Sequence, residues 1–411
     1  MDQSLIIVGG GIAGLSTALA LAHKGIASTI IEKCKQLDTV GAGIQLTPNA
    51  TCILSRWGIL DKLTEVGTIP RFLELKDGIS LKTRLRADLT SLSEKNWKAP
   101  YIAIHRSDLQ KVLYNAVIEN PFIKYIAGET VVLSTQTTTN SINIKTKKTD
   151  SSIETQQKFY STSLLIGCDG VWSTLRKLAP FHERADFSGF IAWRATIELE
   201  NLPQGFRSLL QNMKTITAWM GPKNHLIVYP IQLSKKMFNF VAITYEKNST
   251  EEWTYKENLK SIFKDWNLKI LQLFDYIDEW SYWPIFQMKK NRFLGLGRQV
   301  FVGDCAHATL PFAAQGAAMA IEDAATLAET LSLNISLTQA LALYEKIRTP
   351  RITAVRKRGN FNKLAYHATG PIAIARNVIM KIRTPESIMS NLNWLYMYDA
   401  MNITQMYSKN L

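Results

Sequence analysis

The sequence contains little cysteine, and its cysteines form no recognisable cluster. Cys34, Cys52, Cys168 and Cys305 lie far apart in the 411 residues and form neither a CxxC pair nor a Cys/His group. This spacing argues against a disulfide framework and against a zinc site. Proteins without disulfides are typical of a reducing compartment, so we expect a cytoplasmic location.

The sequence also lacks a hydrophobic run of the kind that crosses a membrane. Residues 5–22 are almost uncharged, but Asp2 precedes them and four glycines between positions 9 and 14 interrupt them. A signal peptide would begin with a positive region, and a spanning helix needs about 20 consecutive apolar residues. No other segment approaches that length, so we expect a soluble or peripherally bound protein.

Acidic residues are scarce relative to basic ones. The chain has 34 Asp+Glu against 48 Lys+Arg, a formal net charge of +14, and 46% of its residues are hydrophobic. This composition excludes a disordered chain and predicts one or two globular domains. The charge suits nucleic acid, anionic lipid or acidic small molecules. No nucleic-acid module accompanies it, so we expect no nucleic acid partner. Part of the charge lies at residues 346–363, where we expect a solvated helical face open to anionic lipid.

The first motif with chemical meaning lies at the N-terminal end. Residues 4–8 predict a buried strand and residues 12–24 a helix, with GGGIAG, a GxGxxG, between them. A second apolar strand, residues 28–31, leads directly to Glu32. Such glycines let the backbone approach a pyrophosphate, the helix N-terminus offers free N–H groups, and the acid accepts hydrogen bonds from a ribose. The unit predicts a dinucleotide site without choosing between FAD and NAD.

A second ligand-facing segment near the other end of the chain decides between these cofactors. Residues 298–302 predict a strand that runs into Gly303-Asp304, and the following loop opens a helix at Gly316. A nicotinamide dehydrogenase does not need a second acid at a strand end to bind its cofactor. FAD is longer, and its binding site does need one. Two further turns carry polar groups: Asp169-Gly170 after a strand, and HRSDL (105–109), where we expect Ser107 to cap a helix.

Four motifs in this order resemble the single-component FAD-dependent aromatic hydroxylases, a family of flavoprotein monooxygenases. They are the glycine-rich start, HRSDL, CDGVWSTLR (168–176) and GDCAHATLPFAAQGAAMAIEDA (303–324). GAGIQLTPNA (41–50) and NWLYMYD (393–399) make the chain most similar to the salicylate hydroxylase branch. The resemblance covers nearly the whole chain.

The resemblance implies an FAD site with assigned residues. Glu32 would bind the adenosine ribose, Arg106 would lie near the phosphates and ribityl chain, and Asp304 would bind the ribitol. The helix that begins at Gly316 would direct N–H groups at the flavin N1–C2=O. Asp169 belongs to a motif associated with FAD and nicotinamide binding, and a plain turn residue is an equally weighted alternative. The cofactor-binding candidates are Gly9, Gly11, Ala13, Gly14, Glu32, Lys33, Gln45, Arg106, Asp169, Gly303, Asp304, Gly316 and Ala317. We expect no metal.

The resemblance also implies an α/β fold: a doubly wound, glutathione-reductase-like FAD-binding domain, an antiparallel β-sheet substrate domain, and C-terminal helices. The FAD-binding domain would comprise residues 1–70, 97–178 and 285–360, the substrate domain 71–96 and 179–284, and the helical segment 361–411. The alternation over residues 187–283 independently favours an antiparallel sheet. Residues 135–152 predict a hairpin, and residues 336–358 predict a helix that Pro350 breaks.

A strand predicted at residues 224–230 carries the candidate catalytic residues. Its period of two places His225 and Tyr229 on one face, with backbones about 13 Å apart, a span that two long side chains can bracket around one ring. An ordinary histidine pKa of about 6.5 suits proton exchange near neutrality. A histidine in a similar strand acts as base in this branch. We therefore hypothesise that His225 is the base and Tyr229 orients the substrate; a hydrogen-bonded core histidine is the alternative.

Three more residues complete the expected substrate site. By the resemblance, the loop from Pro311 to Gln315 lies over the flavin, Gln315 hydrogen-bonds the substrate, and Arg194 meets an anionic group. NAD(P)H would reduce FAD, and a flavin C4a-hydroperoxide formed with O2 would hydroxylate a phenolic or aromatic carboxylate substrate.

Three alternatives to this function stay open. One is a related FAD monooxygenase for a lipid-like quinone precursor or other polycyclic or isoprenoid substrate, and another is a flavin reductase without oxygen transfer. A non-enzymatic isoprenoid carrier is disfavoured by Asp304 and the complete glycine set. The expected partners are a small aromatic substrate and O2, with peripheral membrane contact possible, and the expected state is a monomer or homodimer.

Overall fold

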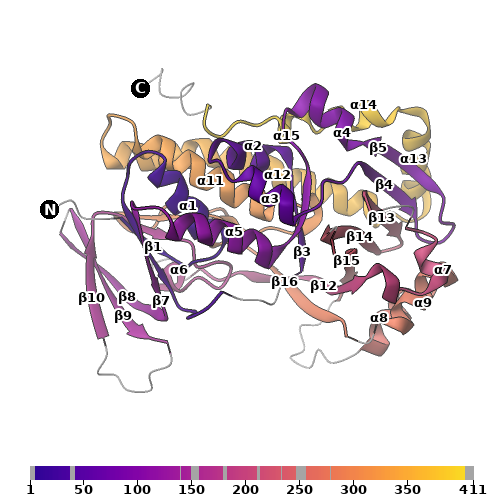
Figure 1. Cartoon of the computed structure of the whole chain (residues 1–411), viewed down its shortest axis with the longest axis horizontal. Helices are drawn as coiled ribbons and strands as arrows, with labels where there is room; N and C mark the ends of the chain where they lie inside the picture. Colours follow the sequence, from indigo (N-terminus) through magenta and orange to yellow (C-terminus); the bar gives the residue numbers. More distant parts are fainter. Residues whose placement is uncertain are drawn as a thin grey trace.

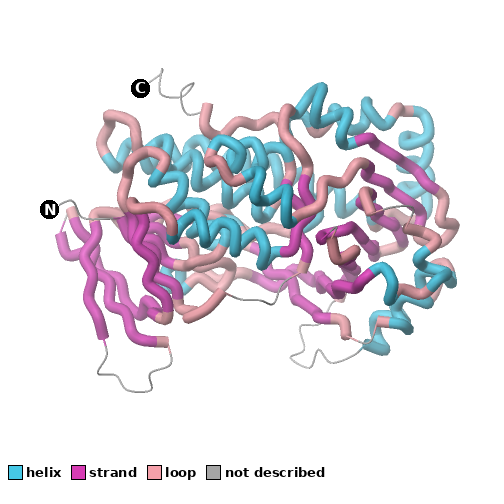
Figure 2. The backbone as a smooth tube through the Cα atoms, viewed as in Figure 1, coloured by secondary structure: helices cyan, strands magenta, loops and turns pink. Residues whose placement is uncertain are grey.

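The computed structural model describes residues 5–37, 42–138, 140–149, 157–178, 183–210, 213–232, 234–246, 256–277 and 279–402. Two large sheets lie toward opposite ends of an elongated molecule, with helices layered over them (Figures 1 and 2). The long helix α12 (Leu337–Tyr366) follows the long axis and contacts elements of both ends.

The first sheet is parallel throughout, as the apolar N-terminal strands predict. Its order is β17-β11-β1-β2-β7, formed by Gln299–Phe301, Leu165–Gly167, Leu5–Val8, Ser28–Glu32 and Ile123–Ala127. Helices cover a parallel sheet on its faces, so its strands have no polar side to show to water. Ile6 and Ile7 of β1 are accordingly buried.

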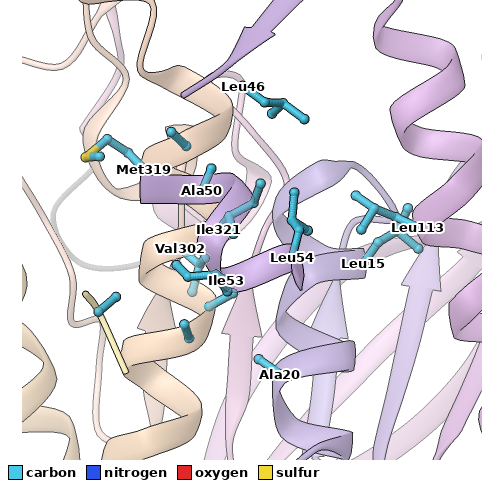
Figure 3. Close-up of a cluster of buried hydrophobic side chains, with 14 of the residues drawn as sticks. Leu15, Ala20, Leu46, Ala50, Ile53, Leu54, Leu113, Val302, Met319 and Ile321 are labelled. Atoms are coloured by element: carbon cyan, nitrogen blue, oxygen red, sulfur yellow. The ribbon is translucent and has the colours of Figure 1, made fainter. Parts of the chain in front are cut away.

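Helices that present small and apolar residues pack over this sheet. Helix α1 (Ile12–Ala22) contacts α5 (Arg106–Ile118) and α11 (Gly316–Leu331), and α2 (Pro48–Arg56) packs on α11. Figure 3 shows their shared core, which includes Leu15, Ile53, Leu54, Leu113 and Ile321. Each such side chain contributes about 1.5–3 kcal/mol on burial, so this layer holds the glycine-rich loops in place.

The second sheet has seven strands in the order β16-β12-β15-β14-β13-β4-β5. They span Ser281–Gln287, Asp186–Glu198, Met237–Tyr245, Asn224–Gln232, Thr215–Gly221, Phe72–Asp77 and Thr83–Asp88. The predicted antiparallel arrangement holds for every neighbouring pair except β13 and β4, which are parallel. The prediction of a sheet over residues 187–283 is wrong for two segments, Lys256–Ile262 (α8) and Leu268–Tyr276 (α9), which are helices. Apolar side chains of these helices pack against one face of the sheet.

Smaller elements complete the fold. In the described part of residues 135–152 the predicted hairpin is present, as β8 (Glu129–Thr138) and β9 (Ser141–Lys148), joined by β10 (Gln157–Thr162). A two-stranded sheet pairs β3 (Gly43–Leu46) with β6 (Ile102–His105). The remaining α-helices in the described ranges are α3 (Leu60–Val66), α4 (Leu89–Leu92), α6 (Thr174–Leu178), α7 (Gln204–Arg207), α10 (Asp304–His307), α13 (Gly370–Ile382), α14 (Pro385–Ser390) and α15 (Asn393–Tyr396). No helix in the described ranges combines the length and apolar character that crossing a membrane requires.

The prediction that Pro350 breaks the long helix is wrong, because α12 continues through it. A proline in a helix interior removes one hydrogen bond and clashes with the preceding turn, at a cost of about 3 kcal/mol. Tertiary contacts offset that cost here. Arg348 and Arg351, on either side of the proline, are buried and form ion pairs with Glu322 of α11. These two arginines also correct the expectation of a fully solvated basic face at residues 346–363.

Candidate active site

The glycines of the GxGxxG turn are required by close backbone contacts. Gly9 has φ +106°, and a Cβ added there would lie 2.5 Å from the carbonyl oxygen of Cys168. A Cβ at Gly14 would lie 1.8 Å from the carbonyl oxygen of Gly9. A Cβ at Gly11 would meet nothing within 4 Å. Two glycines therefore permit the turn, while Gly11, the N-cap of α1, leaves open space in front of the helix N-terminus.

A cavity of about 310 Å³ lies at the carboxyl ends of the parallel strands, and we refer to it as the cofactor cavity. Of the predicted cofactor-binding residues, those that line it are Gly9, Gly11, Glu32, Lys33, Arg106 and Asp169. The Glu32 carboxylate accepts hydrogen bonds from the N–H groups of Gly10 and Cys34. These bonds fix the acid at the end of β2, beside the glycine turn.

Asp169 does two things in the structure. Its Oδ2 accepts hydrogen bonds from the N–H groups of Thr174 (2.7 Å) and Leu175 (3.1 Å), so it caps the first turn of α6. Its Oδ1 is buried and has no hydrogen-bond partner in the described part of the chain. A buried oxygen without a partner is costly, so this atom is available to accept a hydrogen bond from a bound group. Ser173 also caps this helix, by accepting a hydrogen bond from the Arg176 N–H at 3.0 Å.

The second strand end lies against the first. Gly303 has φ +67°, and a Cβ there would lie 3.1 Å from the Ala13 side chain. Asp304 follows as the first residue of α10 and is accessible to solvent. Burial by surrounding protein atoms nevertheless raises the pKa of its carboxyl above the ordinary value, and electrostatic interactions with His307 and Arg106 oppose this rise. The structure thus places Arg106 close enough to Asp304 for their charges to attract each other.

Arg106 itself begins α5, and the helix cap differs from the prediction. The N-cap is His105, whose Nδ1 accepts from the N–H of Ser107, rather than Ser107 itself. His105 is the last residue of strand β6 and directly precedes α5, so its side chain is already in position to cap the helix.

Helix α11 starts at Gly316 with Ala317 next, and its 16 residues direct their dipole toward the loop before it. A Cβ at Gly316 would meet nothing within 4 Å. Gln315, the N-cap, is buried, and its amide is held by Thr47 (2.9 Å) and Asn49 (3.1 Å). The open N-terminus and the unpartnered Asp169 oxygen are features that fit FAD. Gln315 would have to exchange a partner before it reached a substrate.

The substrate-side residues lie on one face of β14, as predicted. Leu226 and Val228 point to the opposite face, in the core beneath the helices. His225 is buried with 2% of its surface exposed, and its Nδ1 lies 2.7 Å from Nε2 of His367, the residue after α12. The His225 ring also packs against Phe312 in the turn Pro311–Ala313. The structure therefore places His225 beside the loop predicted to cover the flavin.

Tyr229 and Arg194 form the other part of the substrate side. The Tyr229 hydroxyl donates to the carbonyl of Gly43 at 2.6 Å, and burial raises its pKa while Arg194 lowers it. Arg194, on β12, has its pKa lowered by burial and by the charge of Arg106. The Arg194 Nε atom is buried without a hydrogen-bond partner among the described residues. A half-buried cation with a buried, unused donor is suited to an anionic group.

Gln45 sits on the substrate side of the molecule. Its Oε1 accepts from the Tyr101 hydroxyl at 2.5 Å and its amide lowers the pKa of Tyr229, whereas the residues that line the cofactor cavity do not include it. Sequence reasoning missed Tyr101 and His367, which belong to no motif. No group of three or more His, Cys, Asp or Glu side chains in the described ranges has the arrangement of a metal site.

The FAD binding domain family matches residues 2–358, and the chain belongs to this family. It is 30% identical over 400 residues to the 3-hydroxybenzoate 6-hydroxylase of Klebsiella oxytoca, covering 95% of this chain and 96% of that protein. Its fold is similar to Klebsiella pneumoniae HpxO solved with FAD and uric acid (TM-score 0.82, 22% identity, 96% and 97% of the two chains). It is also similar to a salicylate hydroxylase substrate complex (TM-score 0.80, 19% identity, 98% of each chain). The protein is an FAD-dependent monooxygenase of the aromatic hydroxylase class, with NAD(P)H as co-substrate.

Proposed function

We propose that the protein hydroxylates a small phenolic carboxylate of the hydroxybenzoate class. The observation that carries this proposal is the half-buried Arg194, whose buried Nε lacks a partner among the described residues and lies beside Tyr229. A buried arginine fork binds a carboxylate in a charge-assisted pair, which is stronger in a protein interior than in water. The relative named as a 3-hydroxybenzoate 6-hydroxylase supports the same class of substrate.

The cofactor would be held mainly by backbone groups and a few charges. Gly9 and Gly11 allow the pyrophosphate to reach the N-terminus of α1, Glu32 accepts from the ribose, and Arg106 and Asp304 flank the chain toward the ring. When bound, FAD supplies the oxygen-transfer chemistry with electrons from NAD(P)H. The N-terminus of α11 offers a positive dipole to the charge that develops on the flavin ring.

The protein side chains prepare the phenol. Burial, aided by His367, lowers the pKa of His225 well below its usual value, so the ring is neutral near pH 7 and free to accept a proton. Removing the phenol proton makes the aromatic ring more nucleophilic. Arg194 holds the carboxylate and Tyr229 orients the ring, while Phe312 and Phe190 pack together and exclude water.

The test screens monohydroxybenzoates, other phenols and hydrophobic quinone precursors for product by mass spectrometry, together with NAD(P)H and O2 consumption. Arg194→Met should raise KM for phenolic acids about 100-fold, since a buried charge pair contributes about 3 kcal/mol. Arg184→Met is the matched control, because Arg184 is exposed. An unchanged KM for phenolic acids in Arg194→Met would overturn the proposal, whereas turnover of phenols without a carboxylate should be equal in wild type and variant. Hydroxylation of a quinone precursor alone would favour the lipid-like substrate class.

The remaining expectations concern location and partners. We propose a peripheral contact with anionic lipid through α13, where Ile374, Ile379 and Ile382 are exposed and Lys381 is nearby in sequence. Cosedimentation of the holoenzyme with anionic and neutral vesicles tests this contact, and equal recovery with both would argue against it. Cytoplasmic location and a monomeric or homodimeric state remain proposals, which fractionation and light scattering test.

A further inference from the structure

His225 has a histidine partner that comes from a distant part of the chain. Its Nδ1 lies 2.7 Å from Nε2 of His367, which is 142 residues away and follows the last turn of α12. The ring centroids are 5.0 Å apart. Because the two nitrogens lie within hydrogen-bond distance, one ring donates and the other accepts. The pair therefore already holds one proton between the two rings.

The two rings differ in their access to water. His225 is buried in an aromatic cluster with Phe312 and Tyr366, whereas His367 is partly exposed. Phe190 packs against His367 as well. The pair consequently runs from the interior, beside the loop expected over the flavin, toward the surface at the end of α12.

A buried base must dispose of the proton that it accepts in each turnover. We propose that His367 is a positioning residue that relays this proton from His225 to solvent, a step that rests on the proposed function. His225 Nε2 accepts the proton of the phenol hydroxyl, and the Nδ1 proton of His225 passes to Nε2 of His367. His367 then releases its Nδ1 proton to water. No electrons move and each ring returns to neutrality. The starting tautomers are restored when the transfers run in reverse: His367 Nδ1 takes a proton from water, the Nε2 proton of His367 passes to Nδ1 of His225, and Nε2 of His225 gives its proton to the phenolate of the hydroxylated product.

The surroundings oppose storage of the proton on either ring. The charged neighbour that acts on His367 is Lys363, and it adds to burial in lowering the pKa of His367 to about 4. Tyr366, which faces His225, has its pKa raised by burial and lowered by Arg358. Lys363 and Arg358 are both cationic, and like charges repel, so a protonated imidazole beside them loses its proton readily. These groups favour transfer to solvent over accumulation of imidazolium.

The test compares His367→Gln with wild-type holoenzyme. Glutamine keeps a hydrogen-bonding group near His225 but cannot relay a proton. We expect hydroxylation near neutral pH to fall about tenfold, a modest part of the effect typical of acid–base groups, with FAD binding unchanged. Added imidazole should restore much of the lost rate to His367→Gln, and the pH profile should change shape. His23→Gln, at an exposed histidine, is the matched control and should change nothing.

Two results would overturn the relay. One is a His367→Gln enzyme with the wild-type rate and pH profile. The other is a rate lowered equally at every pH and unresponsive to imidazole, which would mean that His367 only supports the His225 ring. Failure of the proposed function looks different, because then the wild type itself hydroxylates no phenolic acid.

A readout that needs no turnover separates the two cases further. In FAD-loaded protein with 15N-labelled histidine, the relay predicts that the two rings share one proton and titrate together. His367→Gln should then shift the titration of His225. Two rings that titrate independently in the wild type would overturn the proposal, whatever substrate the enzyme takes.

Discussion

The cofactor end and the substrate end of this molecule use different kinds of groups. The cofactor end relies on glycine turns, helix N-termini and acids at strand ends, and each lies within a short segment such as Gly9–Gly14. The substrate end relies on side chains joined over long separations, such as Tyr229 with Gly43 and His225 with His367. Backbone geometry therefore defines one site, and tertiary packing of side chains defines the other.

The largest effect should come from the glycine turn. Gly14→Ala places a Cβ 1.8 Å from the Gly9 carbonyl oxygen, so we expect loss of more than about 4 kcal/mol and little folded protein. Gly11→Ala meets no atom within 4 Å and should fold with wild-type stability while binding FAD more weakly. Thermal unfolding and flavin absorbance measure both. Equal stability of the two variants would contradict the view that backbone contacts define this end.

The next effect tests the ion cluster that links α11 and α12. Burial alone would raise the pKa of Glu322, but Arg351 and Arg348 outweigh it and hold that pKa below its usual range. Arg348→Met removes one of the two arginines that pair with Glu322 and the arginine that pairs with Asp323, so the buried negative charge is no longer balanced and we expect a loss of about 3–5 kcal/mol. Lys357→Met, at an exposed site on the same helix, should change stability by less than about 0.5 kcal/mol in urea unfolding.

The substrate end should respond in rate and not in cofactor affinity. His225→Gln removes the proposed base, so we expect hydroxylation to fall about 100-fold while FAD binding and the melting temperature stay close to wild type. Stopped-flow measurement with product analysis separates the two effects. An unchanged hydroxylation rate and pH profile would refute the role of His225 as base.

The smallest effect is in the acid dependence of stability. The pKa values of His225 and His367 are lowered in the folded state, so the unfolded chain binds more protons between their unfolded value, near 6.5, and about 4. This contribution is complete above pH 6.5 and is lost as pH falls toward 4. The double variant His225→Gln/His367→Gln should flatten the dependence over that window in chemical unfolding. If the free energy of unfolding of the double variant differed from that of the wild type by the same amount at every pH, the predicted pH dependence would be wrong.

The sequence predicted much of the cofactor end because its signals are local. A strand, a glycine turn, a helix and a terminal acid are adjacent in the chain, and their spacing fixes their geometry. Asp169 shows the limit of such signals. Its place in the turn followed from the sequence, but the unpartnered Oδ1 is visible only once the surrounding atoms are in place.

Other features escaped sequence reasoning because distant contacts decide them. Pro350 follows a local rule, yet the buried arginines beside it hold α12 together. The parallel pairing of β13 with β4 joins segments far apart, and alternation cannot reveal strand direction. Lys256–Ile262 and Leu268–Tyr276 fall within the predicted sheet and are helical instead, and the buried Leu259, Phe263, Trp266, Ile270 and Leu273 recur at the spacing of three or four residues that a helix gives.

The sequence by itself determined the family, the cofactor and the face of β14 that carries His225 and Tyr229, because motif order and a period of two are properties of the chain. The tertiary structure alone decided that His367 meets His225 and that the Arg194 Nε is buried beside Tyr229. The physical reason is that burial and hydrogen bonding depend on neighbours brought together by folding.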